Sequence, residues 1–174
     1  MATEESALVV LVPECEGLVG AWRARFDPAA TYGVAAHVTV LYPFVAPSTI
    51  DDALVSDLRA LFATTPPFGF TLDAVRRFAD QVLYLAPSPP EPFEHLTRTV
   101  AEAFPDCPPY GGQHEKVIPH LSVADGAAPE LLDDIEAALG VGLPIPAFAR
   151  RVSLLVGRDE PGTWCVLDDF LLGT

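Results

Sequence analysis

Two short segments of the chain repeat one arrangement of a histidine and a hydroxyl residue. The first reads Ala-His-Val-Thr-Val and contains His37 and Thr39, and the second reads Pro-His-Leu-Ser-Val and contains His120 and Ser122. Side chains alternate between the two faces of a β-strand, so residues two apart lie on the same face. Each histidine is therefore expected to share a face with its hydroxyl partner, while the apolar residues take the opposite face. The repetition predicts a polar cleft between two equivalent strands.

These residue types suit acid/base catalysis at a phosphodiester. Histidine has an ordinary pKa near ~6.5, so it can accept or donate a proton at neutral pH. With one histidine on each side of a phosphorus atom, one can take a proton from the attacking water and the other can protonate the leaving oxygen. The hydroxyls of Thr39 and Ser122 can donate hydrogen bonds to the non-bridging oxygens. This chemistry requires neither a protein nucleophile nor a metal ion.

Other interpretations of the histidines are weaker. A single histidine in a strand is usually a hydrogen-bonded core residue, but two matched histidines with matched hydroxyls favour a functional site. His95 is also followed by a hydroxyl two residues later, yet it falls in an expected helix, where residues two apart point in different directions. His114, Glu115 and His120 could be metal ligands, but their spacing matches no common zinc signature. We therefore expect no metal site and no catalytic role for His95.

Some aromatic and cationic residues are candidates for substrate contact. Tyr42 and Phe44 could stack on a base, although core packing is the more common role of such residues. Tyr42 lies five residues after His37, which places it on the opposite strand face unless a bulge intervenes. Lys116 and Arg158 could meet a phosphate, although solvated surface charge is their more common role.

The hydrophobic spacing predicts alternating strands and helices. Short apolar runs bounded by Pro and Gly favour strands, and apolar residues three or four apart favour helices. Helix boundaries are indicated by Ser48 or Thr49 as an N-cap, by Pro129 at a helix start and by Gly140 at its end. The expected strands are 7–12, 34–44, 68–75, 82–86, 117–124, 151–156 and 164–171, and the expected helices are 18–26, 51–64, 92–104 and 129–139.

The predicted elements form two similar halves, because a strand, a helix and a hairpin follow in the same order at each histidine motif. The sequence therefore predicts an α+β fold made of a duplicated unit. Each lobe is expected to be an antiparallel sheet with outer helices, and the active-site cleft is expected between the lobes. Because neither half should bury its sheet alone, we expect one bilobal domain over residues 1–174. The lobes are expected at roughly 7–90 and 91–172, with room for exchange of terminal strands.

The composition is acidic, with 10 Lys and Arg against 24 Asp and Glu and a formal net charge of −14. Proteins bind long nucleic acids mainly by neutralising phosphates with Lys and Arg, so this charge disfavours an extended RNA or DNA partner. A ligand with one or two phosphates is compatible with it. Three cysteines without a C-x-x-C pair predict neither a disulfide framework nor a zinc knuckle. An acidic N-terminus without a long apolar run predicts neither a signal peptide nor a membrane span, and we expect a cytoplasmic monomer.

The two motifs resemble those of the 2H phosphoesterase superfamily, in particular its 2′-5′ RNA ligase and cyclic nucleotide phosphodiesterase group. That family carries two H-x-[ST]-x motifs, and here His37 and His120 lie 83 residues apart. The first motif continues as His-Val-Thr-Val-Leu-Tyr-Pro-Phe, which resembles the family's usual tail, and the similarity covers nearly the whole chain. The resemblance implies a bilobal fold with a metal-independent site and no cofactor. It implies phosphate-binding roles for Thr39 and Ser122, water activation by His120 and protonation of the leaving oxygen by His37.

On these grounds we expect a phosphoesterase that opens a cyclic or 2′,5′-type phosphodiester on a small nucleotide or a short RNA end. A 2′-5′ RNA ligase that joins a 2′,3′-cyclic phosphate to a 5′-hydroxyl is an alternative, because acid/base catalysis runs in both directions. A nucleotide-binding module with little turnover is another. Family members that act on large RNAs need basic surfaces, and the basic residues that flank the motifs are few: Arg76, Arg77, Lys116, Arg150, Arg151 and Arg158.

Overall fold

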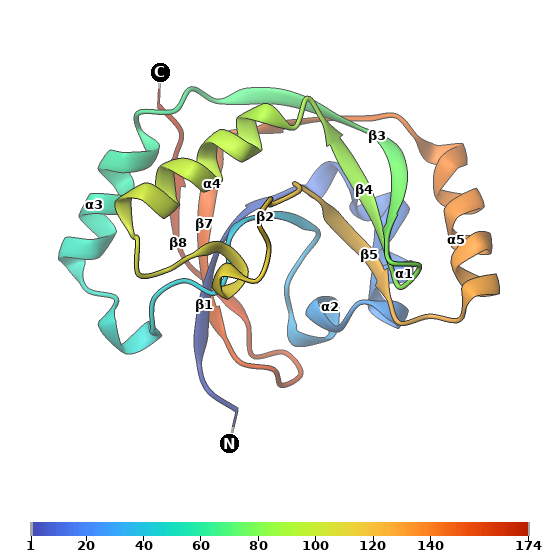
Figure 1. Ribbon diagram of the computed structural model, residues 1–174, viewed down its shortest axis with the longest axis horizontal. Coiled ribbons are helices and arrows are strands. Elements are labelled where there is room, and N and C mark those ends of the chain that lie inside the picture. Colours follow the sequence, from blue (N-terminus) through green and yellow to red (C-terminus); the bar gives the residue numbers. More distant parts are fainter. Residues whose placement is uncertain (1, 174) are drawn as a thin grey trace.

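The computed structural model describes residues 2–173 and contains two four-stranded antiparallel sheets (Figure 1). The strand order is β2-β1-β7-β8 in the first sheet and β5-β4-β3-β6 in the second. The strands are β1 (Glu5–Leu11), β2 (His37–Leu41), β3 (Phe68–Phe78), β4 (Val82–Ser88), β5 (Leu121–Asp125), β6 (Ile145–Ala149), β7 (Arg151–Gly157) and β8 (Cys165–Leu171). The strands that carry the two histidine motifs, β2 and β5, therefore occupy matching edge positions.

Helices cover both sheets. They are α1 (Glu16–Phe26), α2 (Pro28–Tyr32), α3 (Asp52–Phe62), α4 (Glu91–Ala103) and α5 (Pro129–Gly142), with short 3₁₀ turns at Pro13–Cys15, Pro47–Thr49 and Pro109–Gly112. In the lobe built on the first sheet, α3 contacts β8 and α4 contacts β2. In the second lobe α1 contacts β5 and α5 contacts β3 (Figure 1). Each motif strand is thus backed by a helix, which leaves its other face for the cleft.

The apolar residues of the motif strands anchor them in the core. Val38 and Val40 of β2, together with Leu121 and Val123 of β5, are at most 2% exposed. All four belong to one apolar cluster that extends through both sheets. Burial of such side chains is the main favourable contribution to folding. The predicted alternation is therefore confirmed, with the apolar residues of each motif packed inward.

The α+β architecture agrees with the prediction, but the sheets do not divide the chain near residue 90. The β3–β4 hairpin pairs with β5 and belongs to the second sheet, whereas the β7–β8 hairpin pairs with β1 and belongs to the first. The two hairpins are thus exchanged relative to the expected lobes of 7–90 and 91–172. Strand pairing is decided by register and by which apolar faces fit together, and neither depends on order along the chain.

Most predicted elements agree with the structure to within a few residues, and the exceptions have local causes. The strand β5 begins at Leu121 rather than at 117, because Pro119 has no N–H to donate to a strand ladder. The helix α3 is capped by Asp51, whose carboxylate accepts a hydrogen bond from Leu54 N at 2.8 Å. The strand β6 was not expected; its Pro146 is tolerated because β6 is an edge strand.

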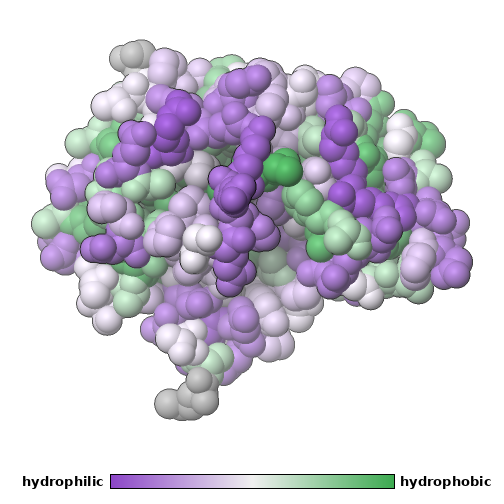
Figure 2. All heavy atoms as spheres, in the orientation of Figure 1, coloured by the Kyte–Doolittle hydropathy of each residue, from purple (hydrophilic) through white to green (hydrophobic). Residues whose placement is uncertain are grey.

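The face of the molecule shown in Figure 2 is largely polar. Hydrophilic residues cover much of the face shown in Figure 2, and hydrophobic ones are scattered among them. Among residues 2–173, no helix is long and apolar enough to cross a membrane.

Candidate active site

The two histidine motifs lie on strands that face each other. Both β2 and β5 are sheet edges, and they are in contact across the boundary between the two sheets. His37 is the first residue of β2, and His120 directly precedes β5. The fold therefore brings together two residues that are 83 positions apart in the sequence.

Each histidine ring is held in the same way. The Nδ1 atom of His37 lies 2.8 Å from the carbonyl oxygen of Ala35, and the Nδ1 atom of His120 lies 2.8 Å from that of Ile118. Because a carbonyl oxygen only accepts hydrogen bonds, Nδ1 must carry a proton in both rings. In the neutral form each Nε2 then holds a lone pair, so it can accept a proton. Each motif thus forms one half of the site, called a half-site below. The two half-sites share the same histidine tautomer as well as the same sequence pattern.

The surroundings lower the pKa of both rings. Burial lowers the pKa of His37 to about 4, and the positive charges of Arg23 and His120 act in the same direction, against the bond to Ala35. Burial also lowers the pKa of His120, opposed by its bond to Ile118. Desolvation disfavours the charged imidazolium form in each case. Both histidines are therefore mainly neutral in the free protein at pH 7.

The hydroxyl partners line the same openings as their histidines. Thr39 lies beside His37 in one pocket, and Ser122 lies beside His120 in another. Both hydroxyl residues are half-buried. The shared strand face predicted for each pair is thus present, and each half-site places a ring nitrogen and a hydroxyl at one opening.

Tyr110 connects the two half-sites, and sequence reasoning missed it. Burial raises the pKa of its phenol, an effect that the neighbouring Thr39 side chain opposes, and its ring is stacked with that of His120, with centroids 6.4 Å apart and planes 25° apart. Its backbone N–H donates to Tyr42 O at 2.7 Å. Tyr110 has φ of 51°, a left-handed conformation that is uncommon outside glycine and that clusters at functional sites. The surrounding Pro-Pro-Tyr-Gly-Gly sequence indicates a turn but not its contact with a distant strand.

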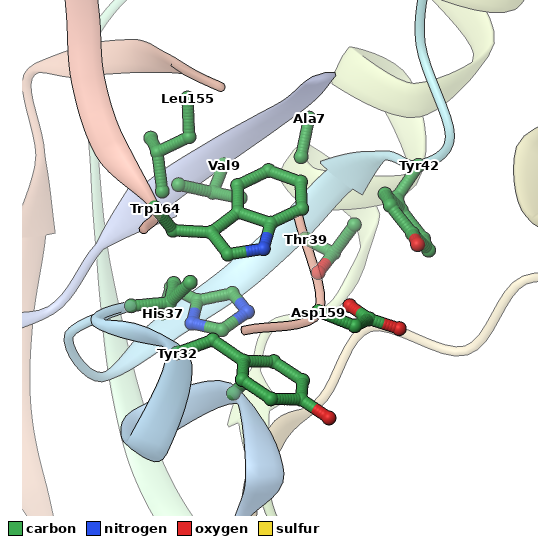
Figure 3. A pocket seen from close by; sticks show the side chains of 11 residues that line it. Ala7, Val9, Tyr32, His37, Thr39, Tyr42, Leu155, Asp159 and Trp164 are labelled. Carbon is green, nitrogen blue, oxygen red and sulfur yellow. The ribbon is translucent and has the colours of Figure 1, made fainter. Parts of the chain in front are cut away.

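An apolar pocket of about 190 Å³ opens beside His37. Figure 3 shows the rings of Trp164 and Tyr32 on either side of His37, with Asp159 nearby. The other residues that line this pocket are mostly apolar: Ala7, Val9, Ala29, Val34, Thr39, Tyr42 and Leu155. Trp164 comes from the β7–β8 hairpin, so this wall could not be assigned to the His37 motif from the sequence.

Tyr42 lies on the pocket side of β2 because a bulge intervenes. The register with β1 pairs Leu8 with Leu41 but Val9 with Thr39, so one extra residue is accommodated on β2. An extra residue reverses the alternation of faces beyond it. Tyr42 therefore lines the pocket together with Thr39, and its hydroxyl donates to Glu5.

The other aromatic and cationic candidates fall in different places. Phe44 is 7% exposed and packs edge-on against Phe104, as expected for a core residue. Lys116 is exposed and lines a pocket of about 470 Å³ beside His120. Arg158 forms an ion pair with Glu160 at 3.0 Å and does not line either pocket. Of the two candidate cations, only Lys116 is placed near a motif.

The remaining histidines lie apart from the pair or at its margin. His95 is exposed on α4, whereas Thr97 is buried and donates to Val40 O at 2.7 Å, so the expected difference in direction is confirmed. His114 is exposed and lies edge-on to Tyr110 at the pocket beside His120. Among residues 2–173 no group of three His, Cys, Asp or Glu side chains lies close enough to hold a metal ion.

Several known proteins are similar to this chain in sequence or in fold. The chain is 23% identical over 171 residues to "Putative phosphoesterase GK0864" of Geobacillus kaustophilus (strain HTA426), and the alignment covers 95% of each protein. The crystal structure of E. coli LigT complexed with 3′-AMP superposes with a TM-score of 0.61 at 18% identity, covering 98% of this chain and 99% of LigT. The structure of TT0787 of Thermus thermophilus gives a TM-score of 0.59 at 19% identity, covering 97% of each chain.

A family model identifies the chain more directly than these distant similarities. The model of the 2′-5′ RNA ligase superfamily matches residues 11–161, which include both histidine motifs. The same residues form the β2 and β5 half-sites and most of the two sheets. The chain therefore belongs to the 2′-5′ RNA ligase superfamily, the family of 2H phosphoesterases.

Proposed function

We propose that this protein is a metal-independent phosphoesterase that hydrolyses a cyclic or 2′,5′-type phosphodiester on a small nucleotide or a short RNA end. One observation carries the proposal. His37 and His120 lie on facing edge strands, and each has Nδ1 held at 2.8 Å by the carbonyl two residues earlier. Two imidazoles in the same tautomer, each with its Nε2 free, match the needs of proton transfer on two sides of one phosphorus.

In the proposed reaction one neutral histidine takes a proton from water, and the water oxygen forms a bond to phosphorus. The bond from phosphorus to the leaving ribose oxygen breaks, and the second, protonated histidine gives that oxygen its proton. The products are a phosphomonoester and one free hydroxyl. The family resemblance gives the water step to His120 and the leaving-group step to His37. Since burial lowers the pKa of His37 to about 4 in the free protein, this assignment requires a bound phosphate to raise that pKa, which a nearby negative charge does.

The hydroxyls serve the phosphate in this proposal. Thr39 and Ser122 donate to the non-bridging oxygens, where negative charge is held in the transition state. The phenol of Tyr110 lies beside Thr39 and restricts the space of the Thr39 hydroxyl. Its ring also packs along His120, so a single loop residue supports both half-sites. Such restraint keeps the donors in place before the reaction begins.

The pocket beside His37 is proposed to take the nucleobase. Aromatic side chains bind bases by stacking on their faces, and Trp164 and Tyr32 provide two rings next to the catalytic histidine. A nucleotide product is compatible with this fold, since the related LigT structure was obtained in complex with 3′-AMP. We therefore place the base against Trp164 and the phosphate between the two histidines.

The charge of the pockets favours a small ligand over an RNA ligase reaction. Among the residues that line the two pockets, Lys116 is the only Lys or Arg, while Asp159 and Asp125 add negative charge. Joining two RNA ends would require both polyanions to bind together, and such binding is driven by several Lys and Arg contacts. A mononucleotide needs one phosphate contact and a base pocket.

The direct test is turnover of the four nucleoside 2′,3′-cyclic phosphates and of a 2′,5′-linked dinucleotide, with the products identified by phosphorus NMR. The proposal predicts a single phosphomonoester isomer from at least one substrate. Ligation of RNA ends without hydrolysis of any of these compounds would favour the ligase alternative. Saturable binding of a cyclic nucleotide without product after prolonged incubation would favour the binding module.

A matched pair of tryptophan variants tests the base pocket. The chain has two tryptophans, and Trp22 lies on α1 outside both pockets. Trp164→Leu should raise KM by about 5- to 150-fold, because stacking of a base on an aromatic ring contributes roughly 1–3 kcal/mol. Trp22→Leu should leave KM near the wild-type value. Equal effects of the two substitutions would place the base elsewhere.

A further inference from the structure

The carbonyl that holds His37 belongs to a short segment fixed by side chains of another element. We name residues 34–36 the strap; it connects α2 to β2, and its middle carbonyl, Ala35 O, receives the bond from His37 Nδ1 at 2.8 Å. The position of the strap therefore decides the direction of the ring and the tautomer of His37. Any group that fixes the strap acts on the histidine without touching the substrate.

Two charged side chains of α1 fix the strap at both ends. Arg23 Nη2 donates to Val34 O at 3.0 Å, and Ala36 N donates to Glu16 Oε1 at 2.6 Å. Both are hydrogen bonds to an ionised group, which are shorter and stronger than neutral ones. The carbonyl between them, Ala35 O, is the one that faces His37. The strap is thus bracketed by one cation and one anion from the same helix.

Arg23 is buried in a way that stability alone does not explain. Its residue is 2% exposed, and its Nε donates at 2.8 Å to Asp27, which is 6% exposed. Burying an ion pair costs desolvation energy, and apolar residues of similar volume often stabilise a fold as well or better. Asp27 also accepts a hydrogen bond from Ala29 N at the start of α2. The pair therefore joins the end of α1, the start of α2 and the strap into one rigid unit.

The second half-site reaches the same ring geometry by a different route. The residue between Ile118 and His120 is Pro119, which has a fixed φ and no N–H. The corresponding residue of the first half-site is Ala36, whose backbone is free to rotate and whose N–H is held by Glu16. The ring of Pro119 covalently restrains the Ile118 carbonyl that holds His120. The Ala35 carbonyl that holds His37 has no such restraint and depends on side chains of α1.

We propose that Arg23 and Glu16 are positioning residues for His37, which hold the strap so that Ala35 O fixes the Nδ1–H tautomer and directs Nε2 toward the phosphate. The effect of this positioning on catalysis rests on the proposed phosphoesterase function, but its effect on the His37 ring does not. The charge of Arg23 has a second effect, because a nearby cation disfavours the imidazolium form of His37. The charged and titratable groups around the ring and the strap are Arg23 and Glu16 from α1, Asp27 between α1 and α2, Tyr32 from α2, Tyr42, His120 before β5, and Asp159.

The test is Arg23→Met, read by NMR titration of His37 and by kinetics. Removing the cation should raise the pKa of His37, and nitrogen chemical shifts should show loss of the single Nδ1–H tautomer. The kcat should fall by about 10- to 100-fold, because small misplacements of a catalytic group have effects of that size. Assignment of the His37 signal comes from its absence in His37→Gln.

Matched variants separate positioning from a general loss of charge. Arg25→Met removes an exposed cation from the same helix and should leave both the pKa of His37 and kcat unchanged. Glu16→Gln keeps an acceptor for Ala36 N and should retain most activity, whereas Glu16→Leu should reproduce the tautomer change. Equal kcat values for Glu16→Leu and wild type would contradict the proposal.

A second variant covers the case in which Arg23→Met does not fold. Arg23→Met combined with Asp27→Leu removes both buried charges, which often preserves or improves stability. The folded double variant should still show the altered His37 tautomer and lowered kcat. A wild-type tautomer and pKa of His37 in a folded variant would overturn the proposal, whatever the activity. If the wild type hydrolyses no phosphodiester, the NMR readout still decides the positioning role, so the two failures are distinguishable.

Discussion

The lowered pKa values of the two histidines predict an acid-shifted pH profile of kcat/KM. One histidine must be neutral and the other protonated, so the rate falls below the lower macroscopic pKa and above the higher one. Burial places the pKa of His37 at about 4 and that of His120 below 6.5. The plateau should therefore lie between about pH 4 and about pH 6.5 in the free protein. This holds for either assignment of acid and base.

The size of the loss of kcat/KM at alkaline pH follows from the higher of the two pKa values. A group with a pKa of 6.5 is about one-eleventh protonated at pH 7.5, so kcat/KM there should be at least about 10-fold below its maximum. The lowered pKa of His120 makes the loss larger. Bound phosphate raises both values, so the profile of kcat should lie at higher pH than that of kcat/KM.

The assay is the initial rate at substrate concentrations well below KM, at constant ionic strength from about pH 4 to about pH 9, with folding checked at each pH by circular dichroism. A maximum of kcat/KM at or above about pH 7.5 would refute the reasoning, because it would require a proton donor whose pKa is raised rather than lowered.

Three further predictions concern the metal, the loop tyrosine and the partner. Turnover should survive EDTA, and loss of activity that zinc or manganese restores would support the metal alternative. Tyr110→Phe removes the phenol hydroxyl beside Thr39 and should lower kcat by about 2- to 10-fold with little change in KM, since one hydrogen bond contributes about 0.5–1.5 kcal/mol; an unchanged kcat would remove Tyr110 from the site. A cyclic mononucleotide should bind with a slope of log K against log salt near about −1, and a slope steeper than about −4 for a structured RNA that binds more tightly at physiological salt would indicate an RNA-binding groove.

The sequence predicted the part of the site that depends on local periodicity. The alternation of His37 with Thr39 and of His120 with Ser122 follows from the strand period of two, and both pairs line openings in the fold. The apolar partners on the other face were predicted by the same rule. The position of His95 in a helix was also predicted, because the apolar residues around it recur every three to four positions.

Features that depend on tertiary pairing could not be predicted in this way. The exchange of the two hairpins brings Trp164 to the His37 pocket, and no local pattern encodes which sheet a hairpin joins. Tyr42 changed faces because of a bulge set by the pairing of β2 with β1. Tyr110 and Arg23 lie in a loop and a helix whose sequences indicate only their own local structure. Their contacts with Thr39 and with the strap arise from long-range packing.

The most direct test of the account is a double-mutant comparison of the two histidines in the presence of EDTA. With a nucleoside 2′,3′-cyclic phosphate, His37→Ala and His120→Ala should each lower kcat by at least ~100-fold, as expected for a positioned acid or base. His95→Ala should match the wild type. Because the two rings act in one step, the double variant should be only slightly slower than the slower single variant. Wild-type turnover by either single variant would contradict paired-histidine catalysis at this site.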